Sequence, residues 1–145
     1  MKRTVVVIDD FDEMTDAVAD VLESDKFDVV CFSEARAALD YINENKVEVV
    51  ITDVRMPEID GTEVIRRLKE TDPLIQVIIM TAYPSVYLII QMLEAGAVDF
   101  LIKPFDVEIL QRAVEQALDR FQRWEHLKIE YVKQKKKKLN DRRAS

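Results

Sequence analysis

Carboxylates gather directly behind the first apolar run of the chain. The sequence VVVIDDFDEM, residues 5–14, passes from apolar residues straight into Asp9 and Asp10. Adjacent carboxylates repel each other, and moving one out of water costs several kcal/mol unless a cation compensates. A third aspartate, Asp53, follows the later apolar run EVVIT, residues 48–52. The pattern predicts a cation site, provided that the fold brings the three aspartates together.

The elements that must position these residues follow from five short apolar runs. The runs are rich in Val and Ile and lack clean alternation, which is typical of strands covered on both faces. They are TVVVI, DVVCF, EVVIT, QVIIM and DFLI, at residues 4–8, 28–32, 48–52, 76–80 and 99–102. Segments with helical periodicity lie near residues 12–25, 34–45, 60–71 and 84–95 and from 106 onward. This alternation predicts an α/β fold with right-handed crossovers and a parallel sheet.

The predicted sheet would collect its polar residues at one edge. In an open parallel sheet, ligands bind beyond the carboxyl ends of the strands. Asp9 and Asp10 follow the first strand and Asp53 the third, while Thr81 and Lys103 follow the fourth and fifth. A hard divalent cation with oxygen ligands would hold the carboxylates together, and Mg²⁺ suits a site of few carboxylates that retains water. We therefore expect a Mg²⁺ site with a hydroxyl and an ammonium group beside it.

Four motifs, in this order, resemble a known family. VIDD at 7–10, ITDVRMPEIDG at 51–61, MTAY at 80–83 and FLIKPF at 100–105 resemble the receiver domain of bacterial two-component response regulators, over about residues 3–122. The resemblance implies a flavodoxin-like, doubly wound sheet of five strands in the order 2-1-3-4-5, with five helices. It also implies a phosphoprotein of phosphorelay signal transduction, which takes a phosphoryl group from a sensor histidine kinase and acts on an output domain or a downstream protein.

The resemblance assigns Mg²⁺ and the phosphoryl group to particular residues. Asp53 is the implied phosphoacceptor and would form an aspartyl phosphate. Asp10, Asp53 and the main-chain carbonyl of Arg55 are implied to ligate Mg²⁺ directly. Asp9 is implied to help through a water molecule. A cis Lys–Pro bond is common in the family after the fifth strand, where this chain has Lys103 and Pro104.

Further residues are implied to respond to the phosphoryl group. Lys103 would pair with one phosphoryl oxygen as a point charge, and Thr81 would hydrogen-bond another. Phe100 stands where the family places a switch aromatic, although an ordinary buried strand residue explains it equally well. Arg55 and Tyr83 either flank the phosphoryl group and tune its hydrolysis or are plain surface residues.

Composition restricts the class of protein. The chain has 145 residues, 48% of them hydrophobic, which suits one core better than two. Cys31 is the only cysteine, and no apolar stretch approaches the ~18 to 20 residues of a membrane span. We expect a cytoplasmic protein with no membrane partner. With only two glycines, Gly61 and Gly96, neither a dinucleotide-binding motif nor a P-loop can be written.

The predicted fourth helix departs from an amphipathic pattern. In SVYLIIQML, residues 85–93, Tyr87 and Leu88 stand where polar residues are expected. A helix that is apolar nearly all round is buried on more than one side, and exposed apolar surface marks a partner site. We expect a homodimer or output-domain contact on a face made by the fourth helix, fifth strand and fifth helix. Local packing against a neighbouring loop is the alternative.

The fifth helix is predicted to continue beyond the edge of the domain. No Gly or Pro follows Pro104, and the apolar stripe continues through Trp124 and Tyr131. We predict a receiver domain over residues 1–122, followed by a helical extension and basic tail over residues 123–145. A projecting apolar stripe favours pairing with a second copy or with an output domain.

Charge along the chain leaves two alternative functions to weigh. Residues 125–145 hold 8 Lys and Arg against 3 Asp and Glu, a net charge of +5, whereas residues 1–124 hold 13 against 25, a net charge of −12. A nucleic-acid-associated protein using the basic run at 133–143 is one alternative, but the acidic body opposes direct nucleic-acid binding. A Mg²⁺-dependent aspartyl-phosphate hydrolase is the other. Without a further positioned acid or base, we expect no enzyme activity beyond slow self-dephosphorylation.

Overall fold

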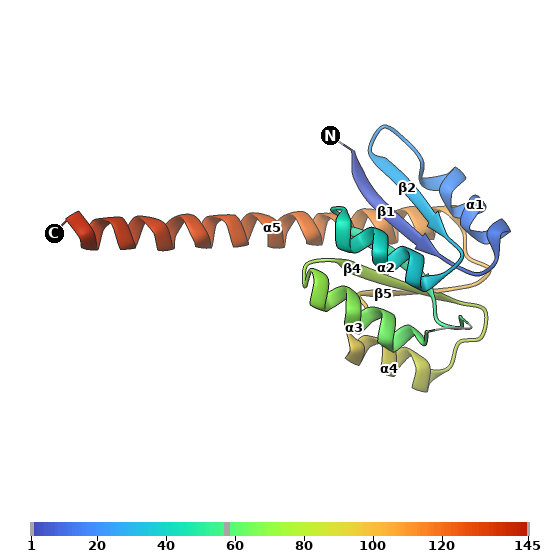
Figure 1. Cartoon of the computed structure of the whole chain (residues 1–145). Helices are drawn as coiled ribbons and strands as arrows, with labels where there is room; N and C mark the ends of the chain where they lie inside the picture. The colour runs from blue at the N-terminus through green and yellow to red at the C-terminus, as the bar shows by residue number, and fades with distance from the viewer. Residues whose placement is uncertain (1, 57–58, 145) are drawn as a thin grey trace.

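The chain alternates strands and helices from end to end (Figure 1). The computed structural model describes residues 2–56 and 59–144. The strands are β1 Arg3–Ile8, β2 Phe27–Phe32, β3 Val49–Asp53, β4 Gln76–Thr81 and β5 Asp99–Ile102. The helices are α1 Asp12–Leu22, α2 Ala35–Glu44, α3 Gly61–Thr71, α4 Val86–Ala95 and α5 Val107–Ala144. The predicted elements are confirmed, with small shifts at their ends.

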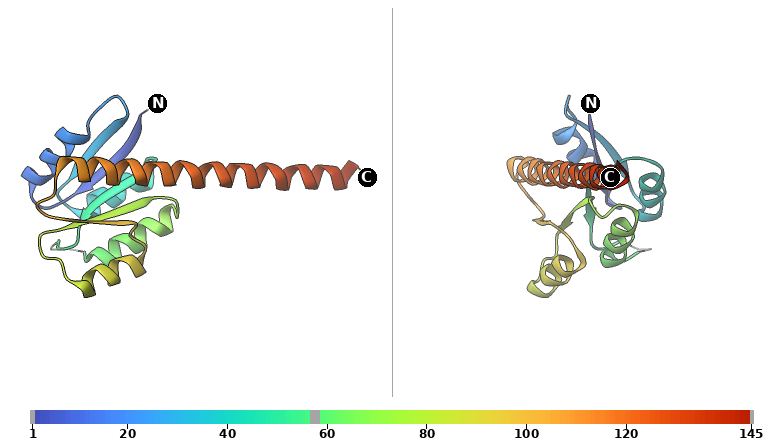
Figure 2. Two further views of the ribbon diagram at one scale, coloured as in Figure 1. Left: turned by 180° about the vertical axis from the view of Figure 1, so that it is seen from behind. Right: turned by 90° about the vertical axis from the view of Figure 1, so that its left-hand side faces the viewer.

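The five strands form one parallel sheet in the order β2-β1-β3-β4-β5, as expected. Helices α1 and α5 cover one face, and α2, α3 and α4 cover the other (Figures 1 and 2). Successive side chains of a strand point to opposite faces. In β1, Val5 and Val7 therefore belong to the core under α1 and α5, while Val6 and Ile8 belong to the opposite core. Burial on both faces explains why the sequence shows no apolar–polar alternation here.

The strand register brings the polar residues to one edge of the sheet. Ile8 lies opposite Thr52, so the residues that follow them, Asp9 and Asp53, are neighbours at the carboxyl ends of β1 and β3. In the same way, Thr81 pairs with Ile102 at the ends of β4 and β5. Lys103 follows directly and is joined to Pro104 by a cis peptide bond. The edge predicted to carry the site is therefore the edge where these residues meet.

Helix α4 presents apolar side chains to solvent. Gly96 ends the helix in the left-handed conformation, with φ at 116°, which other residues rarely adopt. Val86 and Tyr87 are 73% and 77% exposed, and Met92 is the residue that α4 buries. The apolar surface on which we expect a partner contact is therefore exposed in the chain by itself. Packing against a neighbouring loop does not cover this surface.

Helix α5 leaves the body as a straight rod (Figure 2). Its buried residues end at Phe121, and the predicted continuation of the helix is confirmed as far as Ala144. Where the rod leaves the body, Glu125 forms an ion pair with Lys46, with Nζ 2.6 Å from Oε2. The other oxygen of Glu125, Oε1, lies 3.9 Å from the guanidinium group of Arg3. These contacts tie the rod to the end of the sheet opposite the polar edge.

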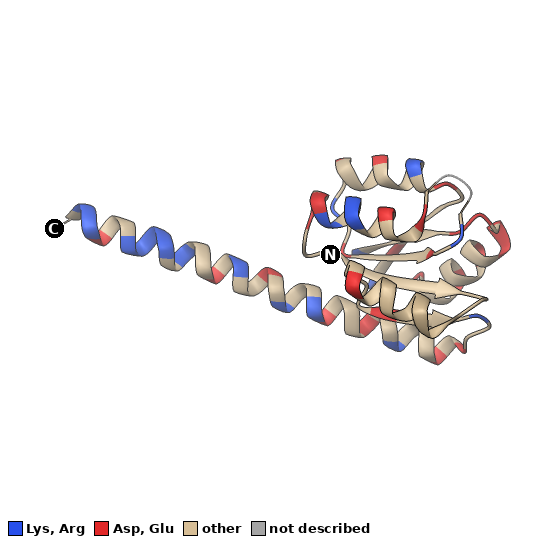
Figure 3. Ribbon diagram, turned by 90° about the horizontal axis from the view of Figure 1, so that it is seen from below, with Lys and Arg blue, Asp and Glu red and all other residues tan. Residues whose placement is uncertain are grey.

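Charge follows this shape. Figure 3 shows the far part of the rod dominated by Lys and Arg, with Asp and Glu spread over the body. The body therefore has a net negative charge and the far part of the rod a net positive charge. In the part of the chain that the structure describes, none of the helices combines the length and apolar character that crossing a membrane needs.

Candidate functional site

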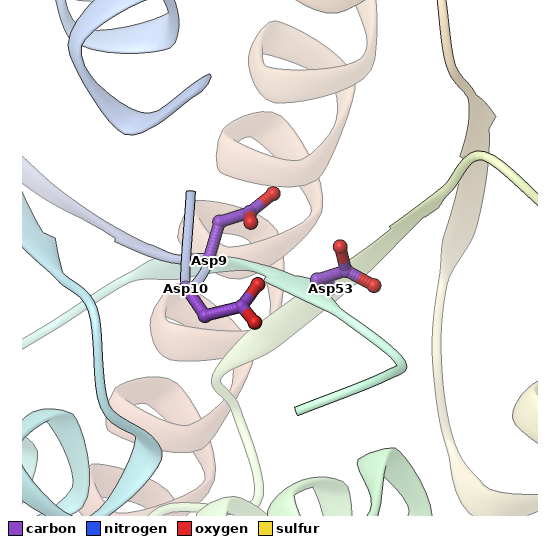
Figure 4. Close-up of side chains that lie close together, drawn as sticks. All are labelled: Asp9, Asp10 and Asp53. Atoms are coloured by element: carbon purple, nitrogen blue, oxygen red, sulfur yellow. The ribbon is translucent and has the colours of Figure 1, made fainter. Parts of the chain in front are cut away.

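Three aspartates lie together at the carboxyl edge of the sheet. Asp9 and Asp10 follow β1 and Asp53 ends β3, and Figure 4 shows the three side chains beside one another. Each offers one carboxylate oxygen, and these oxygens all lie within 4.8 Å of one another. The fold thus joins residues that are more than 40 positions apart in the sequence.

Lys103 supplies a cation to this cluster. Its Nζ donates to Asp9 Oδ2 at 2.7 Å and to Asp53 Oδ2 at 2.8 Å, so the ammonium group bridges two of the three carboxylates. Burial disfavours the charge on Lys103, but hydrogen bonds to Asp53 and Asp9 outweigh burial and raise its pKa. The ammonium group therefore remains charged at neutral pH.

Asp9 is held differently from Asp10. The Asp9 side chain is buried, its Oδ1 accepts a hydrogen bond from the Phe11 N–H at 2.9 Å, and its Oδ2 faces Lys103. Burial raises the pKa of this carboxyl group, and the hydrogen bond from Lys103 opposes that rise. The Asp10 carboxylate is exposed and makes no hydrogen bond or ion pair with the described residues. Of the adjacent pair, Asp10 is the residue whose oxygens remain open to a ligand.

Asp53 and Thr81 are each fixed by a backbone N–H two residues further along. Asp53 Oδ1 accepts from the Arg55 N–H at 3.0 Å, and Thr81 Oγ1 accepts from the Tyr83 N–H at 3.1 Å. Thr81 is buried, and the Asp53 side chain is 14% exposed. Both groups therefore have defined positions before any ligand binds.

Phe100 lies on β5, away from the polar groups. It is half-buried and packs against the core formed by α2, α3 and α4. Its backbone lies beside that of Ile79 in the neighbouring strand. This placement suits either sequence interpretation, a switch aromatic or an ordinary strand residue.

The site opens into a cavity of about 600 Å³. Its walls include all the polar site residues and also residues that sequence reasoning missed. The missed residues, Phe11, Glu13, Met14 and Ala17, come from the start of α1 and the turn before it. Their position directly after Asp9 and Asp10 in the sequence could have indicated that they line the site, because the loop after a strand forms the rim of such a site.

Sequence reasoning also missed a contact between two residues that line this cavity. The Arg55 guanidinium group lies over the Tyr83 ring, with Cζ 5.0 Å from the ring centroid. Arg55 belongs to the β3–α3 loop and Tyr83 to the β4–α4 loop. Side chains of two separate loops therefore meet in the wall of the cavity that the carboxylates line.

The residues present suit Mg²⁺. Magnesium prefers oxygen ligands at 2.0–2.1 Å, so two ligands on opposite sides of the ion lie about 4 Å apart. The three aspartate oxygens lie within 4.8 Å of one another, which leaves room for a shared ion with one longer, water-mediated contact. The donor set is all oxygen and anionic, as Mg²⁺ requires.

Comparison with known sequences identifies the family of this chain. Residues 5–115 match the family described as "Response regulator receiver domain". The chain is 37% identical over 114 residues to the transcriptional regulatory protein ZraR of Escherichia coli, covering 79% of this chain and 26% of that protein. It is 38% identical over 117 residues to the transcriptional regulatory protein FixJ of Bradyrhizobium diazoefficiens, covering 81% and 57%. The chain thus spans between a quarter and just over half of these relatives.

Solved structures agree with the fold and the family. The beryllofluoride-activated NtrC4 receiver domain dimer is similar at 31% identity, with a TM-score of 0.78 over 81% of this chain and 98% of that one. The chemotaxis protein CheY4 of Vibrio cholerae, at 23% identity, shares the fold with a TM-score of 0.76 over 81% of this chain and all of its own. With the family match covering most of its length, this chain belongs to the response regulator receiver domains of two-component signalling.

Proposed function

We propose that Asp53 accepts a phosphoryl group from a sensor histidine kinase. The observation that carries this proposal is the Lys103 ammonium group, which lies 2.8 Å from Asp53 and 2.7 Å from Asp9 beside a cluster of three carboxylates. Phosphoryl transfer needs an in-line nucleophile and cations around the equatorial oxygens, with little other chemistry from the protein. A receiver domain is a signalling domain, and this constellation supports stoichiometric acceptance rather than turnover.

The transfer exchanges one bond to phosphorus for another. A carboxylate oxygen of Asp53 attacks the phosphorus of the kinase's phosphohistidine, a P–O bond forms, the P–N bond breaks, and its electron pair returns to the imidazole ring. Lys103 is positioned to neutralise a phosphoryl oxygen as a point charge. Thr81 Oγ1 accepts from the Tyr83 N–H, so its own proton is free to be donated to another phosphoryl oxygen.

We propose Mg²⁺ as the cofactor, held by Asp10, Asp53 and the main-chain carbonyl of Arg55. When bound, the ion neutralises charge that develops on the phosphoryl oxygens. The Asp9 side chain is only 1% exposed, against 14% for Asp53, and this deeper burial supports a water-mediated role for Asp9. The exposed Asp10 carboxylate supports a direct role.

The proposed response passes from Thr81 to Phe100 and then to a partner surface. The exposed apolar side chains of α4 support contact with an output domain, a downstream protein or a second copy on the face formed by α4, β5 and α5. The solved relative that is described as an activated receiver domain dimer supports the second copy. The rod of α5 offers a further pairing surface. Direct nucleic-acid and membrane partners are not part of this proposal, and we place the protein in the cytoplasm.

We further propose that residues 1–122 are the receiver domain and residues 123–145 a helical extension with a basic tail. The last buried residue of α5, Phe121, supports this division. Any enzymatic activity would be slow self-dephosphorylation. In that reaction water attacks phosphorus, the acyl P–O bond breaks, and the Asp53 carboxylate and inorganic phosphate are released.

Intact mass spectrometry tests the phosphoacceptor. We expect the wild type to gain one phosphoryl group from a small acyl-phosphate donor with Mg²⁺, and to gain none when the metal is chelated. Asp53→Asn should gain none, because an amide is not a nucleophile for this reaction. Asp60→Asn, which changes a carboxylate that caps α3, is the matched control and should be phosphorylated normally. Equal phosphorylation of Asp53→Asn would overturn the assignment.

A further inference from the structure

The wall of the site cavity includes a contact between Arg55 and Tyr83. The guanidinium group lies 5.0 Å from the ring centroid, and both residues line the same cavity as the three carboxylates. Tyr83 is 66% exposed, so water screens this contact, and a cation–π contact is weak in such a place. The contact is therefore one that a stronger partner for the guanidinium group can replace.

Both residues are anchored to the groups that a phosphoryl group would touch. The Arg55 N–H donates to Asp53 Oδ1 at 3.0 Å, and the Tyr83 N–H donates to Thr81 Oγ1 at 3.1 Å. The Arg55 backbone thus lies against the proposed phosphoacceptor. Its long side chain starts within reach of any group attached to that carboxylate.

A phosphoryl group would offer Arg55 a better partner than the tyrosine ring. It brings nearly two negative charges and three strong acceptor oxygens, and a guanidinium group binds such oxygens with paired, charge-assisted hydrogen bonds. These bonds are stronger than an exposed cation–π contact. Lys103 already bridges Asp9 and Asp53 as a point charge, so the planar fork of Arg55 would bind oxygens that the ammonium group leaves open.

We propose that Arg55 is a phosphoryl-binding residue whose guanidinium group contacts Tyr83 until Asp53 is phosphorylated. This inference rests on the proposed role of Asp53. On phosphorylation, the guanidinium group leaves the Tyr83 ring and binds the phosphoryl oxygens. This breaks a side-chain bridge between the β3–α3 and β4–α4 loops. Tyr83 is released next to the exposed apolar start of α4, at Val86 and Tyr87, so the site gains a route to that surface that does not pass through Phe100.

Nuclear magnetic resonance of the full chain tests this exchange. A proton above an aromatic ring resonates upfield, so with Mg²⁺ alone the Arg55 Nε–H signal should lie upfield of its position in Tyr83→Leu. Adding beryllofluoride, which occupies the place of a phosphoryl group, should abolish that difference. The contact between Lys135 and Tyr131, at 5.5 Å on the distant rod, is the matched control and should not respond.

Affinity supplies the second measurement. Arg55→Met should weaken beryllofluoride binding about tenfold or more, because a charge-assisted hydrogen bond is lost. Tyr83→Leu should not weaken it, because the ring competes for the guanidinium group. The inference is overturned if beryllofluoride shifts the Asp53 amide signal while the Arg55 signal stays upfield, or if Arg55→Met binds normally. Absence of any response at the Asp53 amide would overturn the phosphoacceptor proposal as well.

Discussion

At the level of single residues, the site compensates the repulsion between neighbouring carboxylates with an ammonium group. Two adjacent aspartates follow a buried strand, and the structure opposes them with one ammonium group, on Lys103, that contacts Asp9 and Asp53. One ammonium group hydrogen-bonded to two of three clustered carboxylates leaves an excess of negative charge within the cluster. That excess is the physical reason for expecting a divalent ion here.

Asp9 and Asp10 should differ in their effect on this ion. We predict that Asp10→Asn weakens Mg²⁺ binding by about tenfold or more, whereas Asp9→Asn weakens it less, because the oxygens of Asp9 are already engaged by Phe11 and Lys103. Titration of Mg²⁺ followed by calorimetry measures both constants. Asp12→Asn, on the exposed start of α1, is the control. Equal losses in the two variants would contradict the assignment of a direct and a water-mediated ligand.

Lys103 should weaken Mg²⁺ binding rather than strengthen it. Lys103→Met removes the cation that bridges Asp9 and Asp53, so in chelator the variant should be less stable by about 1–3 kcal/mol, since a buried carboxylate loses its partner. Added Mg²⁺ should then stabilise the variant more than the wild type, because the ion no longer competes with an ammonium group. Thermal unfolding with and without Mg²⁺ measures this difference. A smaller gain in the variant would show that Lys103 supports metal binding.

The residue types at strand ends were enough to predict which polar groups meet. Each apolar run ends next to its polar residue, and a parallel sheet aligns those ends. The contact between Arg55 and Tyr83 was beyond such reasoning, because it depends on how two loops bend toward each other. Nor does sequence distinguish the buried Asp9 from the exposed Asp10. That difference arises from the turn after β1.

At the scale of elements, α4 and α5 carry the features that set this chain apart. Strand and helix periodicity predicted both helices, and the absence of Gly and Pro predicted the rod. An apolar partner surface on α4 was the favoured prediction, and local packing stayed an alternative because periodicity cannot say whether a neighbouring element covers an apolar face. The ion pair at the base of the rod, between Lys46 and Glu125, joins residues 79 positions apart. The local sequence around either residue does not predict it.

The base of α5 should loosen when its ion pair is removed. Glu125 accepts from Lys46 at 2.6 Å and lies near Arg3, while the Lys46 ammonium group also lies 5.7 Å from the Phe121 ring. We predict that Glu125→Gln lowers stability by only about 0.2–1 kcal/mol, as for an exposed pair. Hydrogen exchange near Phe121 should nevertheless become faster, because the rod opens locally from the body more easily.

A neighbouring pair on the rod provides the matched control for this element. Glu130 faces Lys133 at 3.8 Å within the helix, away from the body. Glu130→Gln should therefore leave exchange near Phe121 unchanged. If both variants accelerate exchange equally, the contact between Glu125 and Lys46 does not anchor the rod.

At the scale of the whole molecule, an acidic body carries a long basic rod (Figure 3). The described part of the rod beyond Phe121 is exposed for most of its length, and Trp124, Leu127 and Tyr131 are about half exposed or more. Most of the stability of a helix in a protein comes from packing of its apolar face rather than from helix propensity. Pairing of this rod with another surface would supply the burial that it lacks.

Truncation measures how much the rod contributes to assembly. We predict that the full chain self-associates more strongly than a chain ending at Gln122, because pairing buries Trp124 and Tyr131. Analytical ultracentrifugation with and without phosphodonor compares the two, and Trp124 fluorescence should shift with concentration in the full chain. Leu127→Ser is a milder variant that keeps the length of the rod. Identical association of all three chains in both states would make the rod a passive linker.

Chemical trapping locates the phosphoryl group, which we propose is carried by Asp53. Borohydride reduces an aspartyl phosphate to homoserine, and tandem mass spectrometry of the digested, phosphorylated chain locates that residue. We predict homoserine at position 53 only, dependent on Mg²⁺, with Asp9 and Asp10 recovered intact. Homoserine at position 9 or 10, or a stable phosphoryl group that borohydride does not remove, would contradict it.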